Sequence, residues 1–124
     1  MGNRVVVLCK DDGSTEGCYS PGVYLHWGGD DVIKYIKEAS QYMRKGDPLY
    51  AIARFCGVCH EEMEEKVLGL GLVKAPRQED IEDGFEEYSP GDAGVVVINT
   101  DSGELEAFAG YLKENSLPTI TFAM

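Results

Sequence analysis

The sequence predicts an α+β fold built as one domain over residues 1–124. We expect a mostly antiparallel sheet of about five to six strands, with two central, consecutive helices packed on one of its faces. Three observations lead to this prediction. Apolar, β-branched runs bounded by turn residues occupy both ends of the chain, apolar residues recur at helical spacing in the middle, and no repeat or shift in composition divides the chain. At 124 residues the chain can bury a single core without disulfides.

Two strands are expected near the N-terminus. Residues 4–10 form a β-branched apolar run that ends in the turn sequence 11–14, and residues 23–27 form a second run after a proline and a glycine. A long polar connection joins them as an antiparallel hairpin. Because successive side chains of a strand point to opposite faces, we expect His26 on the face opposite Trp27, with Trp27 in the core.

Two helices follow in the middle of the chain. The first begins at a cap formed by Asp30 or Asp31, keeps its apolar residues on one face, and ends near Lys45. The second begins at Asp47, where an aspartate precedes a proline at the first helical position, and runs to about Lys66. Its outward face carries a run of glutamates that is typical of a solvated surface.

The C-terminal half alternates strands and turns. Residues 74–94 are rich in acidic residues and contain two prolines, so we expect an acidic surface loop with elevated mobility and one short helical turn. Gly69 and Gly71 alternate with leucines, which indicates a strand with one crowded face. We expect strands at 68–73, 95–100, 104–108 and 119–122.

The charge of the chain limits its partners. The formal net charge is −11, from 22 acidic and 11 basic residues. Such a chain repels phosphate backbones and anionic lipid headgroups, so direct binding to nucleic acid or membranes is not expected. A basic protein surface is the partner that the charge favours. No apolar stretch approaches the length of a membrane span and the N-terminus shows no signal-peptide pattern, so we expect a cytoplasmic protein.

Four cysteines raise three alternatives to ordinary thiols. Cys56, Cys59 and His60 match the C-x-x-C-H pattern of haem attachment, but that attachment normally occurs outside the cytoplasm. A catalytic dithiol requires a cysteine near a helix N-terminus, whereas Cys56 is expected in mid-helix. A zinc site would draw on Cys9, Cys18, Cys56 and Cys59, with a histidine as a further candidate ligand. We favour buried core thiols and therefore expect no cofactor.

A second group of residues carries chemistry near the ends of the two helices. Tyr50 and Arg54 are four residues apart and share one face of the second helix. If the helices pack antiparallel, these two lie far from His26, and the simpler interpretation is that His26 hydrogen-bonds a neighbour and Arg54 pairs with a carboxylate. The chain has no nucleophile elbow, no P-loop and no zinc-protease helix motif. The candidate site residues are His26, Trp27, Asp30, Asp47, Tyr50 and Arg54.

Four short motifs resemble those of a family of uncharacterised small bacterial and phage proteins. They are a strand ending in His26-Trp27-Gly28-Gly29, an Asp-x-x-Tyr-x-x-Ala-Arg pattern at 47–54, a glycine-rich strand at 68–71 and an apolar strand at 95–101. The family has no established activity, so the resemblance implies no catalytic residues. It favours the residues that it contains as site residues, namely His26, Trp27, Tyr50 and Arg54, and it disfavours a metal or haem site because the cysteine pair is not part of it.

Two hypotheses from different classes result. The first is a non-catalytic acidic binding or accessory protein of mobile-element origin, which meets a basic protein surface and forms a homodimer or a complex. The second is a small enzyme, or a ligand-binding or zinc-binding domain, with its site around His26, Asp30 and Arg54. It requires a concave site in which His26 is at least partly exposed near carboxylates. We favour the first, because no arrangement of nucleophile, base and orienting group is found in the sequence.

Overall fold

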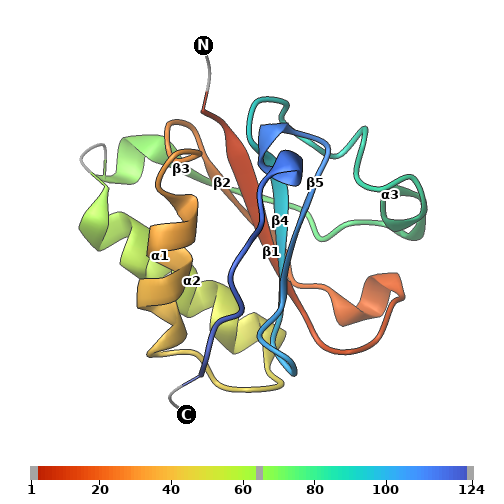
Figure 1. Cartoon of the computed structure of the whole chain (residues 1–124), viewed down its shortest axis with the longest axis horizontal. Coiled ribbons are helices and arrows are strands. Elements are labelled where there is room, and N and C mark those ends of the chain that lie inside the picture. Colours follow the sequence, from red (N-terminus) through yellow and green to blue (C-terminus); the bar gives the residue numbers. More distant parts are fainter. Residues whose placement is uncertain (1–2, 64–65, 123–124) are drawn as a thin grey trace.

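The computed structural model describes residues 3–63 and 66–122, which form one five-stranded mixed sheet with helices on both faces. The predicted α+β class is confirmed. In spatial order the strands are β3 (Leu70–Val73), β2 (Gly22–Leu25), β1 (Val5–Lys10), β4 (Gly94–Asn99) and β5 (Leu105–Phe108) (Figure 1). The α-helices are α1 (Val32–Ser40), α2 (Pro48–Glu62) and α3 (Gln78–Glu82), and short 3-10 helices lie at Glu16–Cys18, Lys66–Gly69 and Tyr111–Glu114.

The central strand pair is the exception to the antiparallel pattern. The N-terminal hairpin is antiparallel as predicted, with Val5 opposite Leu25, and the β2–β3 and β4–β5 pairs are antiparallel too. In contrast, β1 and β4 run parallel, from Val5 opposite Gly94 to Lys10 opposite Asn99. Both strands are buried along almost their whole length, as parallel strands usually are.

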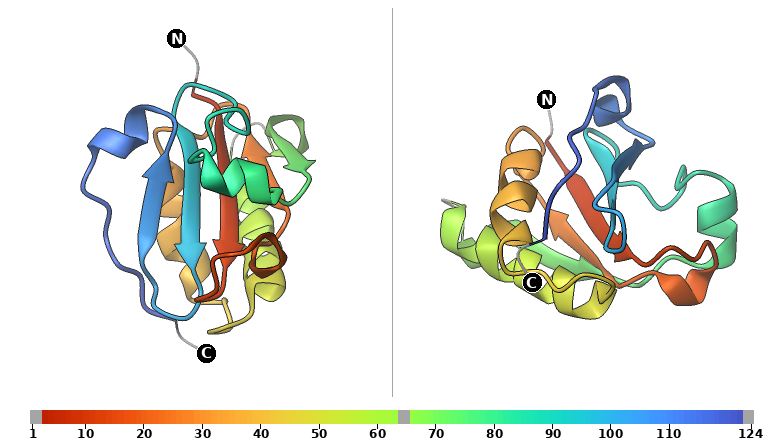
Figure 2. Two further views of the ribbon diagram at one scale, coloured as in Figure 1. Left: turned by 90° about the vertical axis from the view of Figure 1, so that its right-hand side faces the viewer. Right: turned by 60° about the horizontal axis from the view of Figure 1, so that its bottom comes forward.

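Helices α1 and α2 lie side by side on one face of the sheet (Figures 1 and 2). Asp47 caps α2 as predicted, since its carboxylate accepts a hydrogen bond of 3.2 Å from the Tyr50 amide and Pro48 follows at the first helical position. Both helices bury apolar side chains, such as Ile36 and Phe55, against the sheet in the main core. In the described part of the chain, no helix has the length and apolar character needed to span a bilayer.

Both helices are shorter than the apolar periodicity predicted. Helix α1 ends at Ser40, not near Lys45, because the Ser40 hydroxyl donates to the Lys37 carbonyl and the amides that follow bond three residues back in tighter turns. Helix α2 ends at Glu62, short of its predicted boundary, because Met63 takes an extended conformation and buries its side chain. Local hydrogen bonds thus set the end of α1, and burial of Met63 accompanies the end of α2; a periodic pattern contains neither signal.

The acidic segment 74–94 covers the opposite face of the sheet. The short helical turn predicted there is present as α3, but the segment also supplies an apolar layer that its composition did not predict. Phe85 is only 2% exposed, and its ring centroid lies 6.0 Å from Tyr19, 6.0 Å from Tyr88 and 5.0 Å from Phe108. This layer buries the second face of β1 and β4.

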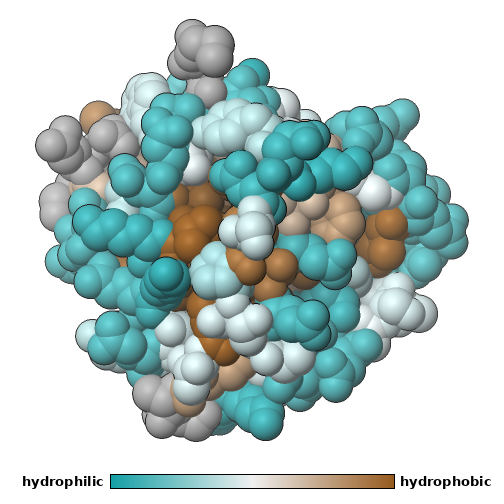
Figure 3. Space-filling model, viewed as in Figure 1, coloured by the Kyte–Doolittle hydropathy of each residue, from teal (hydrophilic) through white to brown (hydrophobic). Residues whose placement is uncertain are grey.

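The predicted final strand at 119–122 is wrong, because this segment lies outside the sheet. Ile120 is buried and its amide donates a hydrogen bond of 2.9 Å to the Gly103 carbonyl, but no strand ladder forms. The alternating pattern of the segment serves to bury every second side chain against the core beside α1. Figure 3 shows this face, on which hydrophilic residues surround a central apolar area.

Removing the Phe85 side chain tests whether the 74–94 segment is part of the folded core. We expect Phe85→Ala to lower the free energy of unfolding by about 3–5 kcal/mol, because it leaves a cavity between α3 and the sheet. Residue 85 has a left-handed backbone conformation with φ 65°, which costs alanine about as much free energy as phenylalanine. The substitution therefore measures the loss of side-chain packing alone. Urea denaturation measures it, with Leu72→Ala at an exposed side chain as the control. A loss below about 1 kcal/mol would show that the segment is a solvated loop.

Candidate functional site

His26 lies just beyond the end of β2 in an exposed aromatic cluster. Its Nδ1 shares a hydrogen bond of 2.6 Å with the Tyr24 hydroxyl, and its ring meets the edge of Trp27 with centroids 4.4 Å apart and planes at 90°. The prediction that His26 hydrogen-bonds a neighbour is confirmed. The prediction that it points away from Trp27 is wrong, because strand pairing stops at Leu25 and the alternation of side chains stops with it.

Trp27 is not a core residue, contrary to the prediction, since half of its side chain (50%) is exposed. The turn that follows β2 is instead fixed by the backbone, where the Gly29 amide donates to the Asn3 carbonyl at 2.7 Å. A Cβ on Gly29 would lie 2.8 Å from that carbonyl oxygen, so the close approach requires glycine. The corner from sheet to helix therefore explains the glycine, and it leaves Trp27 on the surface.

Asp30 ties the start of α1 to two distant segments. One of its carboxylate oxygens accepts from the Asn3 amide at 3.0 Å and the other from the Tyr111 hydroxyl at 3.2 Å. Asp31 occupies the cap position of α1, as one of the two predicted alternatives. Its side chain makes no capping hydrogen bond, so the predicted capping interaction is wrong. The partners of Asp30 give it a structural role at this corner.

Tyr50 forms a separate group with two arginines at the start of α2. The guanidinium carbons of Arg44 and Arg54 lie 4.4 Å and 4.3 Å from the centroid of the Tyr50 ring, and Arg54 also contacts the Tyr50 hydroxyl. Asp47, which caps the helix, lies 3.8 Å from Arg44. Arg54 thus pairs with an aromatic ring and not with the carboxylate that we predicted. Among the described residues, no bond or ring contact joins this group to His26, which lies at the far end of the antiparallel helix pair.

The cysteines do not converge. Cys9 on β1 and Cys59 on α2 are buried in the main core, and burial raises the pKa of both thiols well above the usual range. Cys56, in the middle of α2, is partly buried, and burial raises the pKa of its thiol as well. Cys18 lies partly exposed near the β1–β2 connection. Within residues 3–63 and 66–122, no group of three or more Cys, His, Asp or Glu residues is placed to hold a metal ion.

Two grooves flank α2, and neither is lined by His26. The first, which we call the acidic groove, has a volume of about 590 Å³ and separates the outer surfaces of α1 and α2. The second, which we call the edge groove, has a volume of about 520 Å³ and lies between α2 and β3. The acidic groove is lined by Glu38, Gln41, Tyr42, Ala53, Arg54, Gly57, Val58, Glu61 and Glu62. Of the predicted site residues, Arg54 is the one that lines either of these two grooves.

Sequence reasoning missed both grooves, although one signal was available. Ala53 and Gly57 are exposed, lie four residues apart on α2, and line both grooves. A Cβ on Gly57 would meet no atom within 4 Å, so this position is open space. Small residues at helical spacing on a polar face leave a depression, and this pattern can be found in a sequence.

A pair of carboxylates sits in the acidic groove. The hydrogen bond between Glu38 and Glu62, with burial and the charge of Glu62 as further causes, raises the pKa of the Glu38 carboxyl above its usual value. One oxygen of Glu38, Oε2, is buried without a hydrogen-bond partner among the described residues. With Glu38, Glu61 and Glu62 in its lining, the groove concentrates negative charge.

Comparison of the chain with protein-family models, with curated proteins and with solved structures found no match. The candidate site is therefore assigned from its geometry. The resemblance to small bacterial and phage proteins stays a prediction.

Thiol reactivity tests the placement of the cysteines. We expect an alkylating reagent at neutral pH to modify Cys18 and Cys56 first and to reach Cys9 and Cys59 only after unfolding, because buried thiols form little thiolate. Mass spectrometry of the labelled peptides measures the order. Protein purified without chelator is expected to titrate as four free thiols in denaturant. Stoichiometric zinc that is lost in a Cys56→Ser variant would contradict this assignment.

Proposed function

We propose that this protein is a non-catalytic acidic binding protein that receives a basic protein surface in its acidic groove. The observation that carries the proposal is the gathering of Glu38, Glu61 and Glu62 on a groove of about 590 Å³ in a chain of net charge −11. Such a surface attracts cationic side chains and raises the rate of encounter with a basic partner. The resemblance to small phage proteins adds a mobile-element origin to this proposal.

The carboxylate pair supports a cationic occupant. Glu38 and Glu62 repel each other when both are ionised, and a shared proton relieves the repulsion. A lysine or arginine side chain would replace that proton between the two carboxylates. Arg54 lines the same groove but is engaged with Tyr50, and exposed Tyr42 adds an apolar surface that the stem of a lysine can cover.

The alternative of a small enzyme around His26 has less support. His26 is exposed beside Tyr24 and Trp27, lines neither groove, and does not meet Arg54. The hydrogen bonds of Asp30 tie it to Asn3 and Tyr111. His26, Asp30 and Arg54 thus each bond to different partners in the described part of the chain.

Titration with a lysine-rich peptide tests the proposal. We expect salt-dependent binding that weakens about fivefold when Glu38→Gln and Glu62→Gln are combined, because two charges leave the groove. The matched control combines Glu86→Gln and Glu87→Gln, which remove the same charge from the face that carries α3. Isothermal titration calorimetry measures both. Equal weakening by the two double variants would show that net charge, and not the acidic groove, determines binding.

The pH dependence of stability tests the carboxylate pair itself. Because the pKa of Glu38 is raised in the folded state, its contribution to stability is complete below the usual value of 4.5 and is lost as the pH rises through the raised value. In Glu38→Gln the amide donates to Glu62 at every pH, so we expect this variant to be more stable than the wild type at pH 8. The gain should vanish in acid.

Urea denaturation at pH 8 and at the acid end of the folded range measures this difference. Glu86→Gln serves as the control at an exposed glutamate on the opposite face of the sheet. A Glu38→Gln variant whose gain is the same at both pH values would show that the two carboxyls do not interact.

A further inference from the structure

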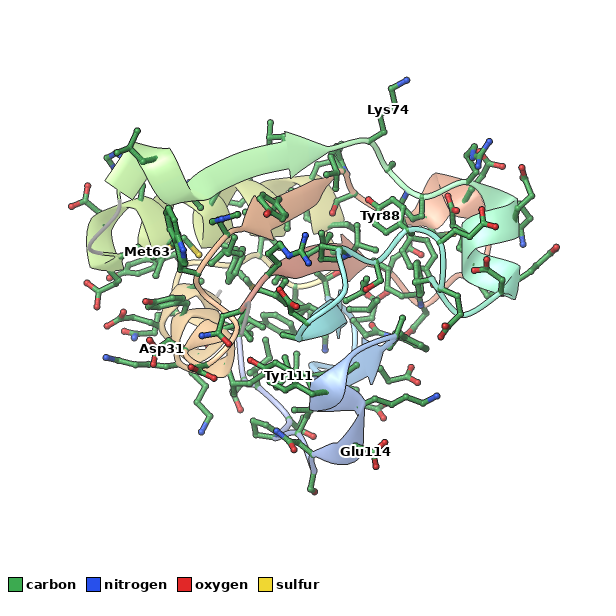
Figure 4. All side chains as sticks on the ribbon, turned by 90° about the horizontal axis from the view of Figure 1, so that it is seen from above. Asp31, Met63, Lys74, Tyr88, Tyr111 and Glu114 are labelled. Carbon is green, nitrogen blue, oxygen red and sulfur yellow. The ribbon has the colours of Figure 1, made fainter. Side chains whose placement is uncertain are left out.

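Strand β3 is the last strand on its side of the sheet, with β2 as its inner neighbour and no described segment outside it (Figure 4). The register shows which backbone groups face outward. The His26 amide donates to the Gly69 carbonyl at 2.9 Å, and the pairing continues inward through Gly71. Because the hydrogen-bonding direction alternates along an antiparallel strand, the N–H and C=O groups of Leu70 and Leu72 face the open edge.

This edge lacks the protection that the other edge of the sheet has. β5 carries Glu106, a charged residue of the kind that keeps edge strands from pairing with other chains. β3 has the sequence Leu-Gly-Leu-Val and carries no charge. Leu68 just before the strand and Leu72 within it are 83% and 73% exposed, more than any other large apolar side chain in the described chain. An open apolar edge of this kind is typical of an interaction surface.

The edge groove lies directly beside this strand. It is lined mainly by Ala53, Cys56, Gly57 and His60 of α2 and by Leu70 and Leu72 of β3. The two leucines face α2 because they pair with Leu25 and Val23, which are buried on that side of the sheet. Glycine weakens a helix interior, and no packing within the described chain requires it at position 57. The glycine therefore leaves room at the groove without serving the fold.

We propose that β3 accepts an extended segment of a basic partner protein as an additional strand. The segment would pair its backbone with Leu70 and Leu72 and place alternate apolar side chains in the edge groove, about one strand spacing outside β3. Backbone pairing supplies affinity in this mode of recognition, and the pockets for alternate side chains supply specificity.

Charge complementarity indicates that the partner segment paired with β3 is basic. This choice of a basic segment rests on the proposed function. Glu61 lines both grooves, so the edge groove continues into the acidic groove with Glu38 and Glu62. Cations at the end of the added strand would reach these carboxylates. A second copy of the chain is the wrong occupant, because each copy carries a net charge of −11 and the two would repel.

The test uses three short peptides on the isotopically labelled protein. The first alternates valine with lysine, the second is the same peptide with every second amide N-methylated so that one edge loses its donors, and the third has glutamate in place of lysine. We expect the first to shift the amide signals of Leu70 and Leu72 in NMR spectra and to bind at least about tenfold more tightly than the other two.

A pair of variants at one position separates backbone from side chain. Leu72→Pro removes an outward N–H and no bond to β2, whereas Leu72→Ala removes the same apolar bulk and keeps that N–H. We expect Leu72→Pro to bind the lysine peptide several-fold more weakly than Leu72→Ala. The N-methylated peptide keeps the test valid if the proline variant does not fold.

The outcomes distinguish this inference from the proposed function. Equal binding of the methylated and unmethylated lysine peptides overturns the added strand and leaves the basic partner standing. Equal binding of the lysine and glutamate peptides supports the strand and overturns the basic partner. A concentration-dependent dimer that Leu72→Pro abolishes, seen by sedimentation, makes a second copy the occupant and overturns the proposal.

Discussion

The parallel pairing of β1 with β4 is the constraint on which the rest of the structure depends. Val5–Lys10 and Gly94–Asn99 are joined through six successive residue pairs, and both strands are buried on both faces. A sheet whose centre is apolar on both sides needs two covers. Helices α1 and α2 supply one, and the layer around Phe85 supplies the other. The strands outside this central pair place β3 at one edge of the sheet and β5 at the other. Of these two strands, β5 carries a charged residue and β3 carries none.

Local patterns in the sequence predicted most of the helices and strands, but they predicted little of how these elements are arranged in space. Helical spacing and the Asp47 cap predicted α2, and apolar runs bounded by turn residues predicted the N-terminal hairpin, because these signals lie within a few residues of each other. The parallel pairing joins segments about ninety residues apart, and no local pattern encodes it. The layer around Phe85 was missed for a related reason, since its isolated aromatics lie in an acidic segment without any period.

The candidate site shows the same division. Residue types that carry chemistry singled out His26, Asp30, Tyr50 and Arg54. The fold gives His26, Tyr50 and Arg54 partners within four residues, and it gives Asp30 partners in two distant segments. The grooves, in contrast, are formed by side chains that are small or missing, above all at Gly57. Inspecting the sequence for reactive side chains does not identify positions where a side chain is small or missing. The two grooves are therefore seen only in the structure, where α2 packs against its neighbours.

The two faces of helix α2 differ in their surroundings. Its inner face buries Phe55 and Cys59 in the main core, while Ala53 and Gly57 on the outer face line both grooves. An open apolar edge beside such a groove invites association of the chain with itself. The net charge of −11 opposes that association at long range, because two copies repel before their edges meet. The basic partner that we propose would meet the opposite sign, so the same acidic composition would favour its approach to the edge.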